Sequence, residues 1–183
     1  LELAAVERAA SAALEAKDQL GIANSVEVAA ARYEDLGAEA IDAILLPAID
    51  HLESTGSRHW TGSVWIHGNK SPFQNLTGHQ ATKVLAHLVS RSTIDMRLDQ
   101  LLAAIGKAHP EKLIDFFGAR VRRERELKSD PEAAKYDAIP FRLHAAERAL
   151  KGVPDYLLRS MRAWYGEDDI GACFSEGVWV RDY

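Results

Sequence analysis

The chain has 183 residues, of which 47% are hydrophobic and 27% charged, a composition typical of one globular domain or one stretch of helical repeats. No apolar run approaches the roughly 20 residues that a membrane-spanning helix needs, because Asp42 and Asp50 interrupt the richest stretch. Cys173 is the single cysteine, which excludes a disulfide within the chain, and we expect a cytoplasmic protein without a membrane segment.

The first third of the sequence predicts helices. Apolar residues recur at three- and four-residue steps over 1–20, and Gly21 is expected to end this helix. Asn24 or Ser25 then caps a second helix over 26–36. The chain begins at Leu1, and we expect it to be a piece of a longer protein.

A third helix is predicted over 38–54, with Pro47 in its middle. Proline lacks a backbone donor, and its ring clashes with the carbonyl of Ala43, so the sequence predicts a kink at this point.

The segment 54–78 is rich in Gly, Ser, Thr and Asn, and it contains two tryptophans. Loops of this length are uncommon in compact domains and are often functional. Aromatic rings on a basic surface could stack on a base or a sugar, whereas the same rings could instead cover one end of the core. The candidate binding residues of this loop are Trp60, Trp65 and His67.

A helix-turn-helix pattern occurs twice in the C-terminal half, after a helical period over 79–89. The copies span 98–117 and 142–161, and in each a proline followed by an acidic residue begins the second helix. The two prolines, Pro110 and Pro154, are 44 residues apart, which lies within the roughly 40–47-residue period of two-helix repeats.

Residues 94–165 resemble HEAT-type α-solenoid repeats on the evidence of Pro110-Glu111, Pro154-Asp155 and their spacing. The resemblance implies an all-α fold in which antiparallel helix pairs stack as an α-solenoid, with 1–183 forming one helical domain. The run from Ala108 to Trp164 also resembles the solenoids attached to large bacterial signalling or defence NTPases. From Gly171 onwards the pattern changes, and we expect a short irregular or strand-like C-terminal tail.

Charge is unevenly distributed along the chain, whose net charge is −5. Residues 1–55 hold 3 basic and 11 acidic side chains, whereas residues 56–163 hold 18 basic and 11 acidic ones. Three arginines of the middle segment, Arg122, Arg123 and Arg125, are candidates for a surface that binds an anionic partner. Two other interpretations remain open, namely attraction between helical layers and compensation of a helix dipole.

No pattern of catalytic residues, metal ligands or a phosphate-binding loop is convincing, so we expect no metal or cofactor and no enzymatic activity in this segment. The leading hypothesis is a non-catalytic helical-repeat scaffold or sensor that recognises a protein, a ligand or other domains of a parent chain. One alternative is a nucleic-acid-binding module that uses the basic middle segment. The other is an all-α hydrolase whose site is assembled from scattered His and Asp residues.

Overall fold

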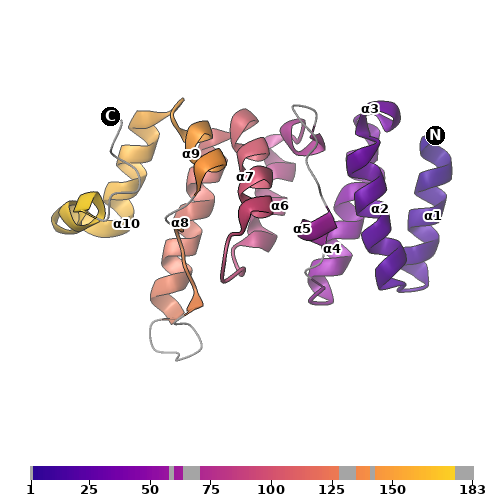
Figure 1. The fold of residues 1–183 in the computed structure, drawn as a ribbon, viewed down its shortest axis with the longest axis horizontal. Coiled ribbons are helices and arrows are strands. Elements are labelled where there is room, and N and C mark those ends of the chain that lie inside the picture. The colour runs from indigo at the N-terminus through magenta and orange to yellow at the C-terminus, as the bar shows by residue number, and fades with distance from the viewer. Residues whose placement is uncertain (1, 58–59, 64–70, 128–134, 141–142, 176–183) are drawn as a thin grey trace. The chain divides into compact units, whose positions relative to one another are not determined.

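All secondary structure in the described part of the chain is helical (Figure 1). The computed structural model describes residues 2–57, 60–63, 71–127, 135–140 and 143–175. The chain divides into two compact units, Leu1–Gln80 and Ala81–Tyr183, here called unit 1 and unit 2. The prediction of an all-α fold is therefore confirmed for these residues.

Unit 1 begins with two helices whose boundaries differ from the prediction. Helix α1 spans Leu3–Glu15 and α2 spans Gln19–Ala31, so Gly21 lies inside α2 and does not end α1. The turn is made instead by Lys17, which has a φ of 54°, and by Asp18, whose Oδ1 accepts a hydrogen bond from the Leu20 N–H at 3.1 Å. A side-chain cap at Asp18 thus sets the start of α2.

The sequence predicts a kink at Pro47, and the structure has a π-helical turn just before this proline. A π-helical segment, Ile41–Leu45, leads directly into α4, Leu46–Ser54, and the Leu46 N–H bonds to the carbonyl of Ile41. Because Pro47 has no N–H to donate, the extra residue in this turn accommodates the missing hydrogen bond. Helix α2 packs against α1, this π turn and α4, and the core includes Ile22, Val26, Ile44, Ile49 and Leu52.

Three short elements complete unit 1. Helix α3 spans Tyr33–Leu36 and ends at Gly37, whose φ of 79° suits glycine. Helix α5, Trp60–Ser63, and the 3₁₀ helix Pro72–Gln74 lie within the segment predicted to be a long loop.

Unit 2 contains the two predicted helix pairs. Helix α6, Gly78–Leu88, begins at the boundary of the units, and it is followed by α7, Met96–Ala108, and α8, Pro110–Leu127. The second pair is α9, His144–Leu150, and α10, Pro154–Ser175. Both second helices therefore begin at the prolines that marked the sequence pattern.

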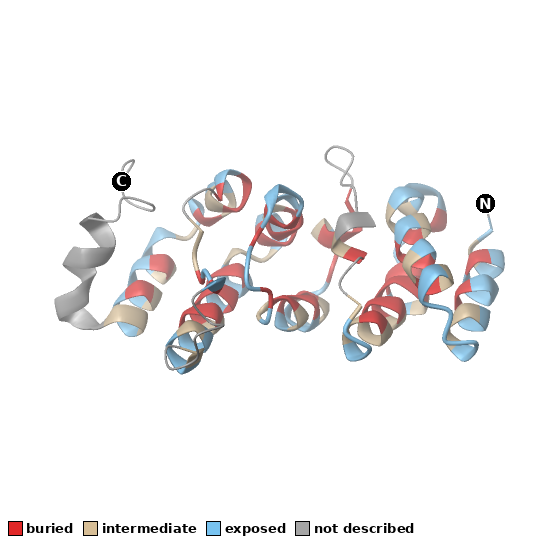
Figure 2. Cartoon of the chain, turned by 60° about the horizontal axis from the view of Figure 1, so that its bottom comes forward, coloured by how far each residue is buried: buried red, intermediate tan, exposed pale blue. Residues whose placement is uncertain are grey.

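The helices of unit 2 pack pair against pair. Helix α7 contacts α8 and α9, while α8 also contacts α10. Each of α7, α8 and α9 has one buried side and one exposed side, as Figure 2 shows. At the 44-residue offset Leu113 corresponds to Leu157 and Phe117 to Met161, and all four side chains are buried.

A buried carboxylate joins the two pairs. Asp99 of α7 is 5% exposed, and its two oxygens accept hydrogen bonds from the backbone N–H groups of Ala145 and Ala146, each at 2.9 Å. These donors lie in the first turn of α9, and they have no partner within that helix. Asp99 therefore caps α9 from a neighbouring helix.

The prediction of a strand-like tail from Gly171 is wrong for the five residues up to Ser175, because α10 continues through them. A glycine inside a helix costs only about 1 kcal/mol, so neither Gly166 nor Gly171 is sufficient to end the helix. The rest of the predicted tail lies outside the described residues.

Candidate functional site

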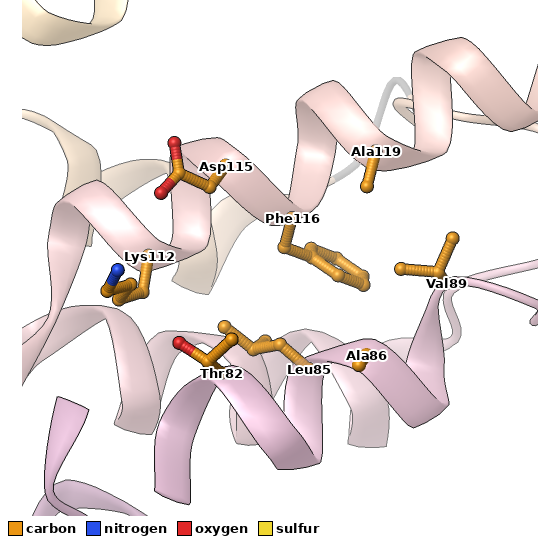
Figure 3. Close-up of a pocket in the computed structure, with 8 residues that line it drawn as sticks. All are labelled: Thr82, Leu85, Ala86, Val89, Lys112, Asp115, Phe116 and Ala119. Atoms are coloured by element: carbon orange, nitrogen blue, oxygen red, sulfur yellow. The ribbon is translucent and has the colours of Figure 1, made fainter. Parts of the chain in front are cut away.

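A groove runs between α6 and α8 in unit 2, and Figure 3 shows the side chains that line it. It has a volume of about 180 Å³. Thr82 and Lys112 lie at one end of the groove, Val89 and Ala119 lie at the other, and Phe116 lies between them (Figure 3). The full lining, here called the α6–α8 groove, is Thr82, Leu85, Ala86, Val89, Lys112, Asp115, Phe116 and Ala119.

Helical periodicity explains why these side chains share a surface. The α8 residues of the groove follow one another at steps of three, one and three, so they lie on one face of that helix. Thr82, Leu85 and Ala86 share a face of α6 in the same way, and Val89 directly follows the end of α6. Leu85 and Phe116 are almost fully buried, whereas Ala86 and Lys112 are exposed. The groove therefore has an apolar floor and a partly charged rim.

The acidic residue of the rim already has a partner. Asp115 accepts a hydrogen bond of 2.7 Å from the hydroxyl of Tyr156, which lies on α10. This hydrogen bond raises the pKa of Tyr156 above its ordinary value, because the neutral phenol is the donor. Asp115 thus links the rim of the groove to α10.

The basic end of α8 lies beyond the groove on the same helix. Arg122, Arg123 and Arg125 are all exposed, as their candidate role requires. Arg123 continues the groove face, since it follows Ala119 by four residues, and Arg122 flanks that face.

Two of these arginines contact other side chains or the backbone. Arg123 forms an ion pair of 3.1 Å with Glu126, and both side chains are about half exposed or more. Arg125 donates to the carbonyl of Trp164 and lies 5.9 Å from the ring centre of Tyr165. Of these three arginines, Arg122 is the one that forms no hydrogen bond or ion pair with the described residues.

Arg120, which precedes this group, is completely buried and belongs to the core. Its guanidinium donates to the carbonyl of Arg91 at 2.5 Å, to that of Ala138 at 2.9 Å and to that of Asp137. The guanidinium also lies 4.6 Å from the ring centre of Tyr136. Burial lowers the pKa of Arg120, because desolvation penalises the charged form. Arg120 therefore holds two loop segments against α8, whereas Arg122, Arg123 and Arg125 are exposed.

The tryptophan loop is only partly described. Trp60 is fully buried, and its indole N–H donates a hydrogen bond of 2.6 Å to Oε1 of Glu53. The ring therefore packs in unit 1 and presents no open face for a base or a sugar. Trp65 and His67 lie outside the described residues.

No group of three or more His, Cys, Asp or Glu side chains in the described ranges could hold a metal ion. In the same part of the chain, no helix is both long enough and apolar enough to cross a membrane. Comparisons of the chain with protein-family models, with curated proteins and with solved structures found no match.

Sequence reasoning missed the groove and the roles of Asp99 and Arg120. The groove is lined by residues of both α6 and α8, and either helix alone has an ordinary amphipathic pattern. Arg120 carried a recognisable signal, because it lies seven residues after Leu113 and four after Phe116, on the apolar stripe of α8.

Proposed function

We propose that the chain is a non-catalytic helical-repeat module of the HEAT type that binds a protein partner, and that the α6–α8 groove is part of its binding surface. The observation that carries this proposal is the groove itself. It combines a buried apolar floor at Leu85 and Phe116 with exposed polar and charged side chains at its rim. Helical partners commonly bind proteins by laying an apolar face into a groove of this kind.

The packing of unit 2 supports the repeat interpretation. Two successive helix pairs, α7–α8 and α9–α10, pack first helix against first helix and second helix against second helix. Stacked pairs of this type bury a continuous core and leave long helical faces open for binding. The groove lies on one such face, that of α8.

The test is affinity capture from cells that express the protein, with a matched pair of variants. Ala86→Arg places a long charged side chain in the groove, whereas Ala163→Arg makes the same change at an exposed position of α10. The proposal expects a protein that is retained by the wild-type chain and by Ala163→Arg but lost with Ala86→Arg. An identical set of captured proteins for all three chains would contradict it.

A second binding assay separates this function from nucleic-acid recognition. If exposed arginines contacted phosphates, the affinity for a nucleic acid would fall steeply with salt concentration. Reversal of Arg122 and Arg123 to Glu would then abolish nucleic-acid binding. We expect no such binding to single- or double-stranded oligonucleotides, because Arg123 and Arg125 already have partners within the chain.

A further inference from the structure

We propose that the α6–α8 groove binds an amphipathic α-helix that carries an acidic side chain at each end of its apolar stripe. This inference rests on the proposed function and adds the chemistry of the partner. It follows from the shape of the groove floor and from two cations that lie near its ends.

The floor of the groove selects an apolar stripe. Its apolar lining includes Leu85 and Val89 on the α6 side and Phe116 and Ala119 on the α8 side (Figure 3). An α-helix presents apolar residues at positions i, i+3, i+4 and i+7, which form a narrow ridge that enters such a groove.

Two cations determine the charge of the partner. Lys112 lies at one end of the groove and Arg122 flanks its far end, and neither forms an ion pair with any described residue. The acidic rim residue, Asp115, is engaged by the hydroxyl of Tyr156, and Glu126 is engaged by Arg123. Among the described residues, neither cation has an ion-pair partner, so a partner helix can offer a carboxylate to each.

The spacing of the cations sets the spacing of the acids. Lys112 and Arg122 are ten residues apart on α8, a distance of about 15 Å along the helix axis. A helical partner that lies along α8 would match this distance with acidic residues ten or eleven positions apart. Two acidic residues have the same spacing whichever way the partner helix runs, so the expectation holds for a parallel or an antiparallel partner.

A protein helix fits these features better than a nucleic acid does. The floor is apolar, whereas a phosphate backbone carries a charge at every nucleotide and would place charges against that floor. A helix can place one carboxylate at each cation and keep its apolar side chains between them.

The experiment is selection from a displayed library of 18-residue helices with a fixed apolar stripe. The flanking positions are drawn from Glu, Gln and Lys, and the bait is the full 183-residue chain. Enriched peptides are then synthesised and titrated against the wild-type chain, against Lys112→Gln/Arg122→Gln and against Lys107→Gln/Arg162→Gln. The last variant removes two exposed cations of α7 and α10 that do not line the groove, so it is the matched control for net charge.

The proposal expects enrichment of Glu pairs ten or eleven positions apart. Two exposed ion pairs usually contribute enough for about a two- to 30-fold change in affinity, so this is the loss expected with Lys112→Gln/Arg122→Gln. The control variant should change the affinity by less than about twofold. Enrichment of Lys or Gln, equal losses in both variants, or displacement of the peptide by an oligonucleotide would overturn it. A further outcome is enrichment of peptides without acidic pairs that bind the wild-type chain but not Ala86→Arg. That result would overturn this inference, and the proposed function would still hold.

Discussion

Arg120→Ala is expected to destabilise unit 2 strongly, because this guanidinium holds two loop segments against α8. It donates to the carbonyls of Arg91, Asp137 and Ala138. A hydrogen bond to a charged group contributes about 1.5–3 kcal/mol, and the cost of burying the guanidinium offsets part of that sum. Removal of the side chain leaves these carbonyls without a donor and opens a cavity, so we expect a loss of about 3–5 kcal/mol in the free energy of unfolding.

The assay is urea unfolding followed by far-ultraviolet circular dichroism, together with amide hydrogen exchange. Hydrogen exchange is needed because the chain has two compact units, and it reports on 88–91 and 136–138 separately from unit 1. Arg123→Ala is the matched control, since Arg123 lies on the same helix in an exposed ion pair, and it should cost no more than about 1 kcal/mol. A loss below about 1 kcal/mol for Arg120→Ala would refute the proposed anchoring role.

Three further predictions concern the helix contacts of unit 2. Asp99→Ala should cost about 1–2 kcal/mol and accelerate hydrogen exchange at Ala145 and Ala146, because α9 loses its cap; unchanged exchange there would argue against capping. Gly118→Ala should weaken the packing of α8 against α10 by about 1–3 kcal/mol, because the added Cβ would lie 2.9 Å from Cε2 of Trp164. The change should also alter tryptophan fluorescence, and Gly152→Ala, whose added Cβ would meet open space, is the control. Asp115→Ala should lower the pKa of Tyr156 towards its ordinary value, as measured by ¹³C NMR of labelled tyrosine, and an unchanged pKa would mean that the hydrogen bond is absent in solution.

The sequence predicted the helix pairs of unit 2 well, because prolines mark the starts of two helices. Pro110 and Pro154 begin α8 and α10, as their fixed φ and missing N–H favour at a first helical position. The predicted boundaries of the first two helices were wrong, because no proline marks the start of α2. Gly21 resembled a helix end, but the actual turn depends on Lys17 and Asp18, and a positive φ at a lysine has no clear sequence signal.

The candidate site was predicted only in part. The exposure of Arg122, Arg123 and Arg125 agrees with the expectation for a basic helix end. The sequence left open whether Trp60 stacks on a ligand or covers the core, because the partner of its indole N–H, Glu53, lies on a different helix. The groove likewise takes its lining from both α6 and α8, so no single segment of sequence indicates it.

The central claim is that the α6–α8 groove binds a protein partner, and site-specific photo-crosslinking tests it most directly. A benzophenone side chain replaces Ala86 in the groove or, as the control, Ala163 on the exposed side of α10. After irradiation in cells, we expect one protein adduct from position 86 whose crosslinked peptide is an amphipathic helix, and no such adduct from position 163. The absence of an adduct at position 86, or the same adducts at both positions, would contradict the claim.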